Sequence, residues 1–325
     1  MGRLHAQNVA RYIKDAKVVA VADVDATRAT SLAEIVGAGR VYDDPTALVS
    51  DAKVRAVIVT TPAVTHEDLV VSCAHAGRDV FCEKPLATTV EGARRAARAA
   101  VDHGIRLQVG FMRRFDPTYL FAKEAIDSGA IGTPLVYKGI TRDRLAPPRA
   151  YLALTARNGL LVDTGVHEFD TARWLLGDEV VRVQAMGDVL NNRELADVQG
   201  PDAIVVNMRF SRGGLSNIDL FWGVRYGDDV RAEVIGSTGS ISIGITARVP
   251  VTVMTEAGLV QRGYQDHFDR FGDSYLAEMV AFVEAIRNDR ENTGAAADDG
   301  VKSVEIAAAA ERSMAQHMAA VDLPL

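Results

Sequence analysis

The first 25 residues, "MGRLHAQNVARYIKDAKVVAVADVD" (1–25), begin with a glycine directly after the first methionine and end with two aspartates, Asp23 and Asp25. Gly2 opens a segment with the apolar spacing of a helix, and a β-branched run follows that ends at Asp23. In a dinucleotide-binding βαβ unit, a glycine-rich turn lies about 20 residues before an acidic residue for the adenosine ribose. Gly2 therefore stands where the last glycine of that turn is expected, with Arg3 and Leu4 beginning its helix.

An N-terminal helix can also start with an ordinary glycine, but the distance to Asp23 favours the nucleotide-binding reading. We then expect a parallel sheet without its first strand, and a natural reading frame that extends roughly ten residues upstream of Met1. Loss of a central strand would expose two edges and destabilise the sheet. An in-frame stop codon directly before Met1 would contradict this hypothesis.

Residues 1–115 alternate between β-branched runs and helical spacing. The runs cover 17–24, 54–62, 79–85 and 105–111, and Asp25 and Thr88 or Thr89 are candidate helix N-caps. This alternation predicts a parallel sheet with crossover helices, which is a Rossmann-type α/β domain.

Residues 116–325 show a different pattern of polar and apolar residues. Several runs alternate polar and apolar residues, as expected for a half-exposed antiparallel sheet, and helices are predicted near 117–129, 167–176, 273–288 and 300–320. We therefore predict an NAD-binding domain over 1–115 and an α+β domain with a large open, mostly antiparallel sheet over 116–325. The second domain would bind the substrate and form the oligomer contact.

Composition excludes several classes of protein. The 36 basic and 43 acidic residues give a net charge of −7, and no basic block suggests a nucleic-acid or membrane partner. The two cysteines, Cys73 and Cys82, fit a reducing cytoplasm. The seven histidines show no compact metal-ligand spacing, so no metal is expected.

Three short segments carry candidate chemistry. "VTTPAVTH" (59–66) and "FCEKPLA" (81–87) each follow a predicted strand, at the edge of the sheet where ligands bind. "GLLVDTGVHEFD" (159–170) has Asp163 and His167 four residues apart, on one face if the segment is helical. Taken singly, each segment has a structural explanation such as a turn, a solvated lysine or a core histidine.

In this order, the three segments resemble the Gfo/Idh/MocA family of NAD(P)-dependent oxidoreductases. "QVGFMRRFDPTY" (108–119) and "VDTGVHEFDTARWLLG" (162–177) are similar to its inositol dehydrogenase branch. The resemblance covers nearly the whole chain. It implies hydride transfer from a secondary alcohol carbon of a polyol or sugar to a nicotinamide, giving a ketone.

The resemblance also implies roles for individual residues. Lys84 and His167 would handle the hydroxyl proton, and Asp163 would orient that pair and shape its charge. Oxidation of an alcohol needs a base with a pKa near neutrality, which histidine has and lysine can acquire. The remaining implied contacts to the cofactor are Gly2, Arg3, Leu4, Asp23, Thr60, Thr61, Pro62, His66, Glu83, Lys84 and Arg113, and those to the substrate are Met112, Arg113, Asn158, Asp163, His167 and Tyr226.

Cofactor choice follows from charge at the ribose. Asp23 would bind both ribose hydroxyls of NAD and repel a 2′-phosphate, so NAD is predicted over NADP. Arg28, one helical turn further on, is the residue that counts against this preference. Arg114 is expected to be structural, and a turn role explains Asn158 and Tyr226 nearly as well as a substrate contact.

Other functions remain open at this point. The substrate could be another cyclitol, an aminocyclitol or a hexose, and a non-catalytic NAD- or sugar-sensing protein of the same fold is a second class. The retained Lys84, Asp163 and His167 favour the enzyme. We also expect homo-oligomers, dimer or tetramer, through an apolar face of the second sheet.

Overall fold

The chain divides into two compact units. The computed structural model describes residues 1–152, 159–193, 197, 200–244, 248, 251–256, 258–261, 263–291 and 294–324. The first unit is Met1–Phe115 with Asp273–Val304, and the second is Asp116–Gly272 with Glu305–Leu325. The sequence placed 273–304 in the second domain, but helix α10 (His267–Arg287) packs Met279, Phe282 and Ile286 into the core of the first unit. Because these side chains are buried in the core of the first unit, residues 273–304 group with that unit and not with the second.

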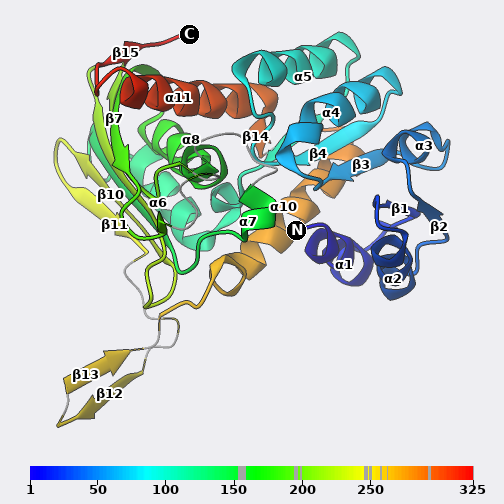
Figure 1. Cartoon of the computed structure of the whole chain (residues 1–325), viewed down its shortest axis with the longest axis horizontal. Coiled ribbons are helices and arrows are strands. Elements are labelled where there is room, and N and C mark those ends of the chain that lie inside the picture. Colours follow the sequence, from blue (N-terminus) through cyan, green and yellow to red (C-terminus); the bar gives the residue numbers. More distant parts are fainter. Residues whose placement is uncertain are drawn as a thin grey trace. The chain divides into compact units, whose positions relative to one another are not determined.

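The parallel sheet of the first unit is in two pieces. Strands β1 (Ala20–Ala22) and β2 (Arg40–Tyr42) pair with each other, and β3 (Ala56–Val59), β4 (Asp79–Glu83) and β5 (Leu107–Gly110) form the other piece, with β14 (Ala295–Ala296) antiparallel at its edge (Figure 1). Within the described ranges, no ladder joins β1 to β3. A largely apolar cavity of about 400 Å³ is lined by both strands and by helix α1 (Gly2–Tyr12). The predicted interruption of the Rossmann sheet is thus confirmed.

Local sequence explains where the helices of this unit begin and end. The Asp25 side chain accepts hydrogen bonds from two amides of α2 (Ala26–Val36), which ends at Gly37 in the left-handed region with φ 69°. The Thr89 side chain caps α5 (Val90–Asp102) by accepting a hydrogen bond from the Gly92 amide. The other helical segments are α3 (Pro45–Ser50), η1 (Ala63–Thr65), α4 (His66–His75) and η2 (Met112–Phe115).

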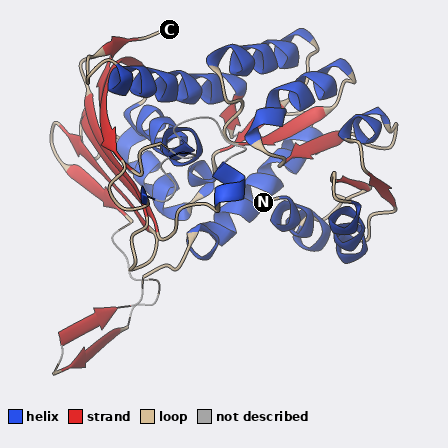
Figure 2. Cartoon of the chain, in the orientation of Figure 1, coloured by secondary structure: helices blue, strands red, loops and turns tan. Residues whose placement is uncertain are grey.

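The second unit is built on one seven-stranded sheet in the order β11-β10-β6-β9-β8-β7-β15 (Figure 2). Its β6–β9 pair is parallel and its other pairs are antiparallel, which confirms the predicted open, mostly antiparallel sheet. The strands are β6 (Pro134–Asp143), β7 (Val180–Asp188), β8 (Ala203–Phe210), β9 (Leu215–Trp222), β10 (Asp229–Gly236), β11 (Ser240–Ile243) and β15 (Val321–Asp322).

Period-two alternation gives this sheet one buried and one outward face. In β8, for example, Ile204, Val206 and Met208 are buried, whereas the intervening residues point outward. Helix α8 (Val166–Leu176) packs on β6. In α11 (Ala297–Ala315), the Ser313 hydroxyl donates a hydrogen bond to a carbonyl in the loop before β15 and accepts one from a β7 amide. The remaining helical segments of the unit are α6 (Pro117–Asp127), α7 (Arg149–Leu152) and the π-helical turn η3 (Leu160–Gly165).

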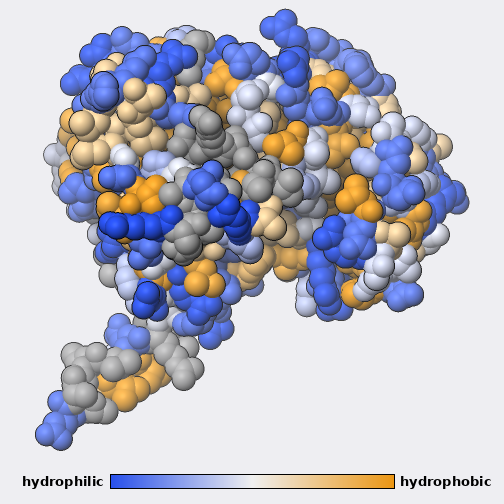
Figure 3. Space-filling model, viewed as in Figure 1, coloured by the Kyte–Doolittle hydropathy of each residue, from blue (hydrophilic) through white to orange (hydrophobic). Residues whose placement is uncertain are grey.

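A separate hairpin, β12 (Thr252–Thr255) with β13 (Gly258–Gln261), carries exposed apolar side chains (Figure 3). Val253 and Met254 expose 54% and 77% of their surface, which leaves this hairpin with little apolar burial of its own. Among the described residues, every helix is too short or too polar to cross a lipid bilayer.

Candidate active site

Glu83 and Lys84 lie at the carboxyl end of β4, as the sequence predicted. The Glu83 carboxylate uses both oxygens: Oε1 lies 2.7 Å from Nε2 of His5 on α1, and Oε2 accepts from the Lys84 amide at 3.2 Å. The Glu83 side chain is buried and Lys84 is half-buried. Glu83 therefore fixes the backbone at the residue predicted to handle the substrate proton.

A second carboxylate faces His5 from α10. Glu278 Oε1 is 4.0 Å from His5 Nε2, and the side chains of His5, Glu83 and Glu278 are buried. Burial works to raise the pKa of Glu83, but the hydrogen bond and charge of His5 outweigh it, so the pKa lies below its usual value. Burial, with the Glu83 charge added, raises the pKa of Glu278. The three ligand-type atoms lie within 4.8 Å of one another, close enough for a cation, although the sequence predicts no metal.

His66 connects the two strand-end segments of the first unit. Its Nδ1 lies 2.7 Å from the Pro85 carbonyl and its Nε2 lies 2.8 Å from the Thr61 carbonyl. Thr65 occupies the N-cap position of α4, and the His66 ring turns inward and does not cap the helix. Burial lowers the pKa of His66. The ring thus holds the loop after β3 against the Lys84–Pro85 segment.

The opening glycine lies against the end of β3. A Cβ atom built on Gly2 would lie only 2.7 Å from Thr60 Oγ1, so α1 can approach the strand this closely because residue 2 has no side chain. Arg3 and Leu4 follow in the first turn of α1. This close contact between helix and strand is the role expected of the last glycine in a dinucleotide-binding turn.

Asp23 follows β1 and is partly neutralised by Arg28. Arg28 Nη2 lies 2.8 Å from Asp23 Oδ1, and its Nε lies 3.6 Å from an oxygen of Asp25. The hydrogen bond to Asp23 and its charge raise the pKa of Arg28. The arginine that counted against NAD in the sequence is therefore engaged by the same carboxylate that would bind the ribose.

Met112 and Arg113 follow β5 and are buried, with 3% and 2% of their surface exposed. Arg114 forms an ion pair with Asp299 at 2.9 Å, in keeping with its expected structural role. All the residues named so far lie in the first unit.

Asp163 and His167 lie in the second unit, on consecutive turns of one helical stretch. Asp163 belongs to the π-helical turn η3, where Tyr151 donates to its Oδ1 at 3.4 Å. His167 is the second residue of α8 and exposes 9% of its surface. The helical spacing predicted for this pair is therefore present.

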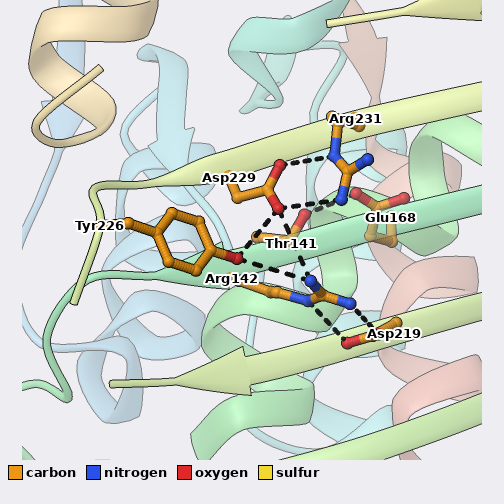
Figure 4. Close-up of polar contacts among 7 residues, drawn as sticks. All are labelled: Thr141, Arg142, Glu168, Asp219, Tyr226, Asp229 and Arg231. Carbon is orange, nitrogen blue, oxygen red and sulfur yellow. Dashed lines mark hydrogen bonds and ion pairs between the residues drawn. The ribbon is translucent and has the colours of Figure 1, made fainter. Parts of the chain in front are cut away.

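Tyr226 lies apart from this pair, on the outward face of the sheet. Its hydroxyl donates to Asp229 at 3.2 Å and accepts from Arg142 at 3.5 Å, within a ladder that also includes Asp219 and Arg231 (Figure 4). The helix that carries His167 packs on the opposite face. Asn158, the other predicted substrate contact, lies outside the described residues.

Sequence reasoning did not single out Asp143, a half-buried polar residue of the second unit. Asp143 at the end of β6 accepts hydrogen bonds from Thr164, next to Asp163, and from the Trp222 indole at the end of β9. Only the position of Asp143 after a strand could have signalled it, because Trp222 lies 79 residues away along the chain.

Comparison with protein families identifies both halves of the chain. Residues 1–111 match the Gfo/Idh/MocA model described as an oxidoreductase family, NAD-binding Rossmann fold. Residues 123–323 match the corresponding C-terminal alpha/beta domain of the same oxidoreductase family.

Individual relatives agree with these matches. The chain is 37% identical to scyllo-inositol 2-dehydrogenase (NAD(+)) of Bacillus subtilis, over 89% of this chain and 84% of that protein. It is 39% identical to inositol 2-dehydrogenase 2 of Saccharopolyspora erythraea, over 97% and 90%. The crystal structure of scyllo-inositol dehydrogenase from Lactobacillus casei with bound NAD(H) and scyllo-inositol superposes with a TM-score of 0.92, at 28% identity, over 99% and 95% of the two chains.

Proposed function

Because the chain belongs to the Gfo/Idh/MocA family of oxidoreductases, we propose that it oxidises a secondary hydroxyl of a cyclic polyol to a ketone, with NAD as the hydride acceptor. The observation that carries this proposal is the match of both halves of the chain to one family, together with inositol dehydrogenases as relatives along most of its length. The substrate class is therefore inositol-like.

The first unit offers groups that fit a dinucleotide. The tight contact of Gly2 with Thr60 leaves the start of α1 free of side-chain bulk, and a helix N-terminus favours phosphate. Asp23 provides the carboxylate for the ribose hydroxyls. Thr61, Pro62 and Glu83 would line the rest of the cofactor. When bound, NAD supplies an acceptor for the hydride.

The protein itself must remove the hydroxyl proton. We propose that Lys84 and His167 accept and pass on this proton, and that Asp163 orients them and stabilises positive charge as it develops. A base placed within hydrogen-bond reach typically contributes 10²–10⁴-fold to the rate. Met112 and Arg113 would contact the substrate, and the carboxylate of Glu83 would hold the Lys84 backbone through the 3.2 Å hydrogen bond.

Spectrophotometry tests this proposal. We expect NADH absorbance to rise when myo-inositol or scyllo-inositol is added to the protein with NAD⁺, and to rise less with glucose. Lys84→Ala should lower kcat by about 10²–10⁴-fold with NAD⁺ affinity retained. Lys14→Ala, at an exposed lysine beyond α1, is the matched control and should behave as wild type.

Three results would contradict the proposal in different ways. Equal turnover in Lys84→Ala would remove Lys84 from the mechanism. Tight NAD⁺ binding without oxidation of any polyol or sugar in a broad panel would favour the sensing function. Oxidation of an aminocyclitol or hexose alone would change the substrate class while keeping the reaction.

We further propose that the protein forms homo-oligomers through the outward face of the second unit's sheet and acts in the cytoplasm. On that face, the exposed side chains of Met186 and Val205 lie opposite each other on β7 and β8. The face also carries ion pairs, so it is less apolar than the sequence predicted. The two free, buried cysteines support a reducing compartment. We also propose, as predicted from the sequence, that the first domain binds the cofactor and the second domain binds the substrate.

A further inference from the structure

Three polar side chains from three elements meet at one end of the second unit's sheet. Asp143 ends β6, Trp222 ends β9, and the two residues are register partners in the parallel pair. Asp143 Oδ2 accepts from Trp222 Nε1 at 2.9 Å and from Thr164 Oγ1 at 3.1 Å, and the indole N–H also lies 3.1 Å from Thr164 Oγ1. One carboxylate thus ties two strand ends to the turn that precedes α8.

This group lies largely out of water. Trp222 is fully buried and Thr164 exposes 5% of its surface, while the Asp143 residue is half-buried. Burial raises the pKa of Asp143 to about 7, and the charges of Asp228 and Asp163 add to the effect, while the bonds from Thr164 and Trp222 oppose it. The carboxyl group therefore changes its charge near neutral pH.

The charged groups around Asp143 come from three directions. Asp163 faces it from η3 and Asp228 from the segment before β10, where Asp228 accepts from the Arg144 amide at 2.8 Å. The neighbouring Arg142 side chain is engaged on the outward face by Asp219 and Asp229. Among the described residues, the carboxylates of Asp228 and Asp163 raise the pKa of Asp143, and hydrogen bonds from two neutral donors lower it.

We propose that Asp143 is a positioning residue for the Asp163–His167 segment, which it fixes through its hydrogen bonds to Thr164 and Trp222. An ionised carboxylate accepts both bonds strongly, whereas a protonated one accepts them weakly, so the anchor of η3 loosens when the pH falls below neutrality. The inference rests on the proposed function only in the role given to Asp163 and His167.

Tryptophan fluorescence reads the Asp143–Trp222 contact without any turnover. The chain has two tryptophans, so Trp174→Phe leaves Trp222 as the only emitter. We expect the emission of this variant to change sigmoidally between pH 5 and pH 9 with a midpoint near 7. Adding Asp143→Asn should abolish the transition, and Asp219→Asn, which removes a β9 carboxylate from the other face, should leave it in place.

Thr164→Val provides a second variant in case Asp143→Asn fails to fold. Because the Thr164 hydrogen bond lowers the pKa of Asp143, its loss should move the midpoint upward. A transition that persists in Asp143→Asn, an emission that stays flat from pH 5 to 9, or an unmoved midpoint in Thr164→Val would each overturn the assignment.

Kinetics tests the link to the active site. In Asp143→Asn we expect kcat for polyol oxidation to fall about tenfold at pH 8 with NAD⁺ affinity unchanged, which is the loss of roughly one charge-assisted hydrogen bond. We also expect the pH dependence of kcat near pH 7 to change in this variant. Unchanged kcat and an unchanged pH profile would separate Asp143 from the mechanism, even if the fluorescence result held. Absence of turnover in the wild type would count against the proposed function and leave the fluorescence test valid.

Discussion

Asp23 is the residue whose surroundings bear most directly on cofactor choice. Its carboxylate must serve both the ribose hydroxyls and Arg28, which lies 2.8 Å away and is largely exposed. A ribose can compete for the carboxylate because the exposed ion pair is weak in water. Removal of Asp23 would instead leave Arg28 with only the Asp25 contact, beside the position expected for a 2′-phosphate.

We therefore expect Asp23→Ser to weaken NAD⁺ binding about tenfold, the loss of one or two hydrogen bonds to a charged group, and to improve NADP⁺ binding. Adding Arg28→Ala should cancel the gain with NADP⁺. Titration calorimetry with both nucleotides measures the effect, with Asp43→Ser, at an exposed carboxylate nearby, as control. Identical NAD⁺ affinity in Asp23→Ser would rule out the ribose contact.

The sequence could predict on which strand or helix each candidate residue lies, but not which residues it contacts. Glu83 and Lys84 follow a recognisable strand, and Asp163 and His167 have helical spacing. Their partners are distant in sequence: His5 lies 78 residues from Glu83, and Asp143 lies 79 from Trp222. Such contacts depend on how strands are ordered in the sheet, which local patterns do not encode.

At the scale of elements, strong periodicity and caps were sufficient for most helices. Asp25 and Thr89 begin helices as candidate N-caps, Thr89 being one of the two that the sequence offered for α5. The three-residue β2 and the short α3 were missed, because neither is long enough to show a period. The sequence also could not predict that α10 packs in the core of the first unit. The pattern of an amphipathic helix shows that one of its faces is buried, but not which core that face joins.

The core contributed by α10 gives a stability prediction. Phe282 exposes 2% of its surface and its ring centroid lies 5.9 Å from that of Phe81. Phe282→Ala should lower the free energy of unfolding by about 3–5 kcal/mol, because it removes buried surface and leaves a cavity. Urea denaturation followed by circular dichroism measures this loss.

Phe121→Ala is the matched control, since this side chain on α6 is 73% exposed, and it should change stability by less than about 0.5 kcal/mol. Equal effects of the two substitutions would show that α10 does not stabilise the first unit in the way described.

For the molecule as a whole, the outward face of the large sheet leads to a prediction about assembly. Light scattering at micromolar concentration should give a mass that is a multiple of 34.9 kDa. Val205→Arg should reduce it to a single chain, because a charge would be buried against the neighbour. Val101→Arg, at a 78% exposed position on α5, should leave assembly intact. A wild-type monomer would refute the proposed interface.

The divided sheet of the first unit has a consequence for its local dynamics. Strand β4 is bonded on both edges, whereas β1 and β3 each have one edge without a ladder partner in the described structure, facing the cavity. Amide protons on those edges lack the protection that hydrogen bonding gives. Deuterium uptake by peptides covering 18–23 and 56–60 should therefore reach completion well before uptake by 79–83, and equal rates would contradict this. We therefore expect solvent to reach the sheet along this gap while the strands on either side stay folded.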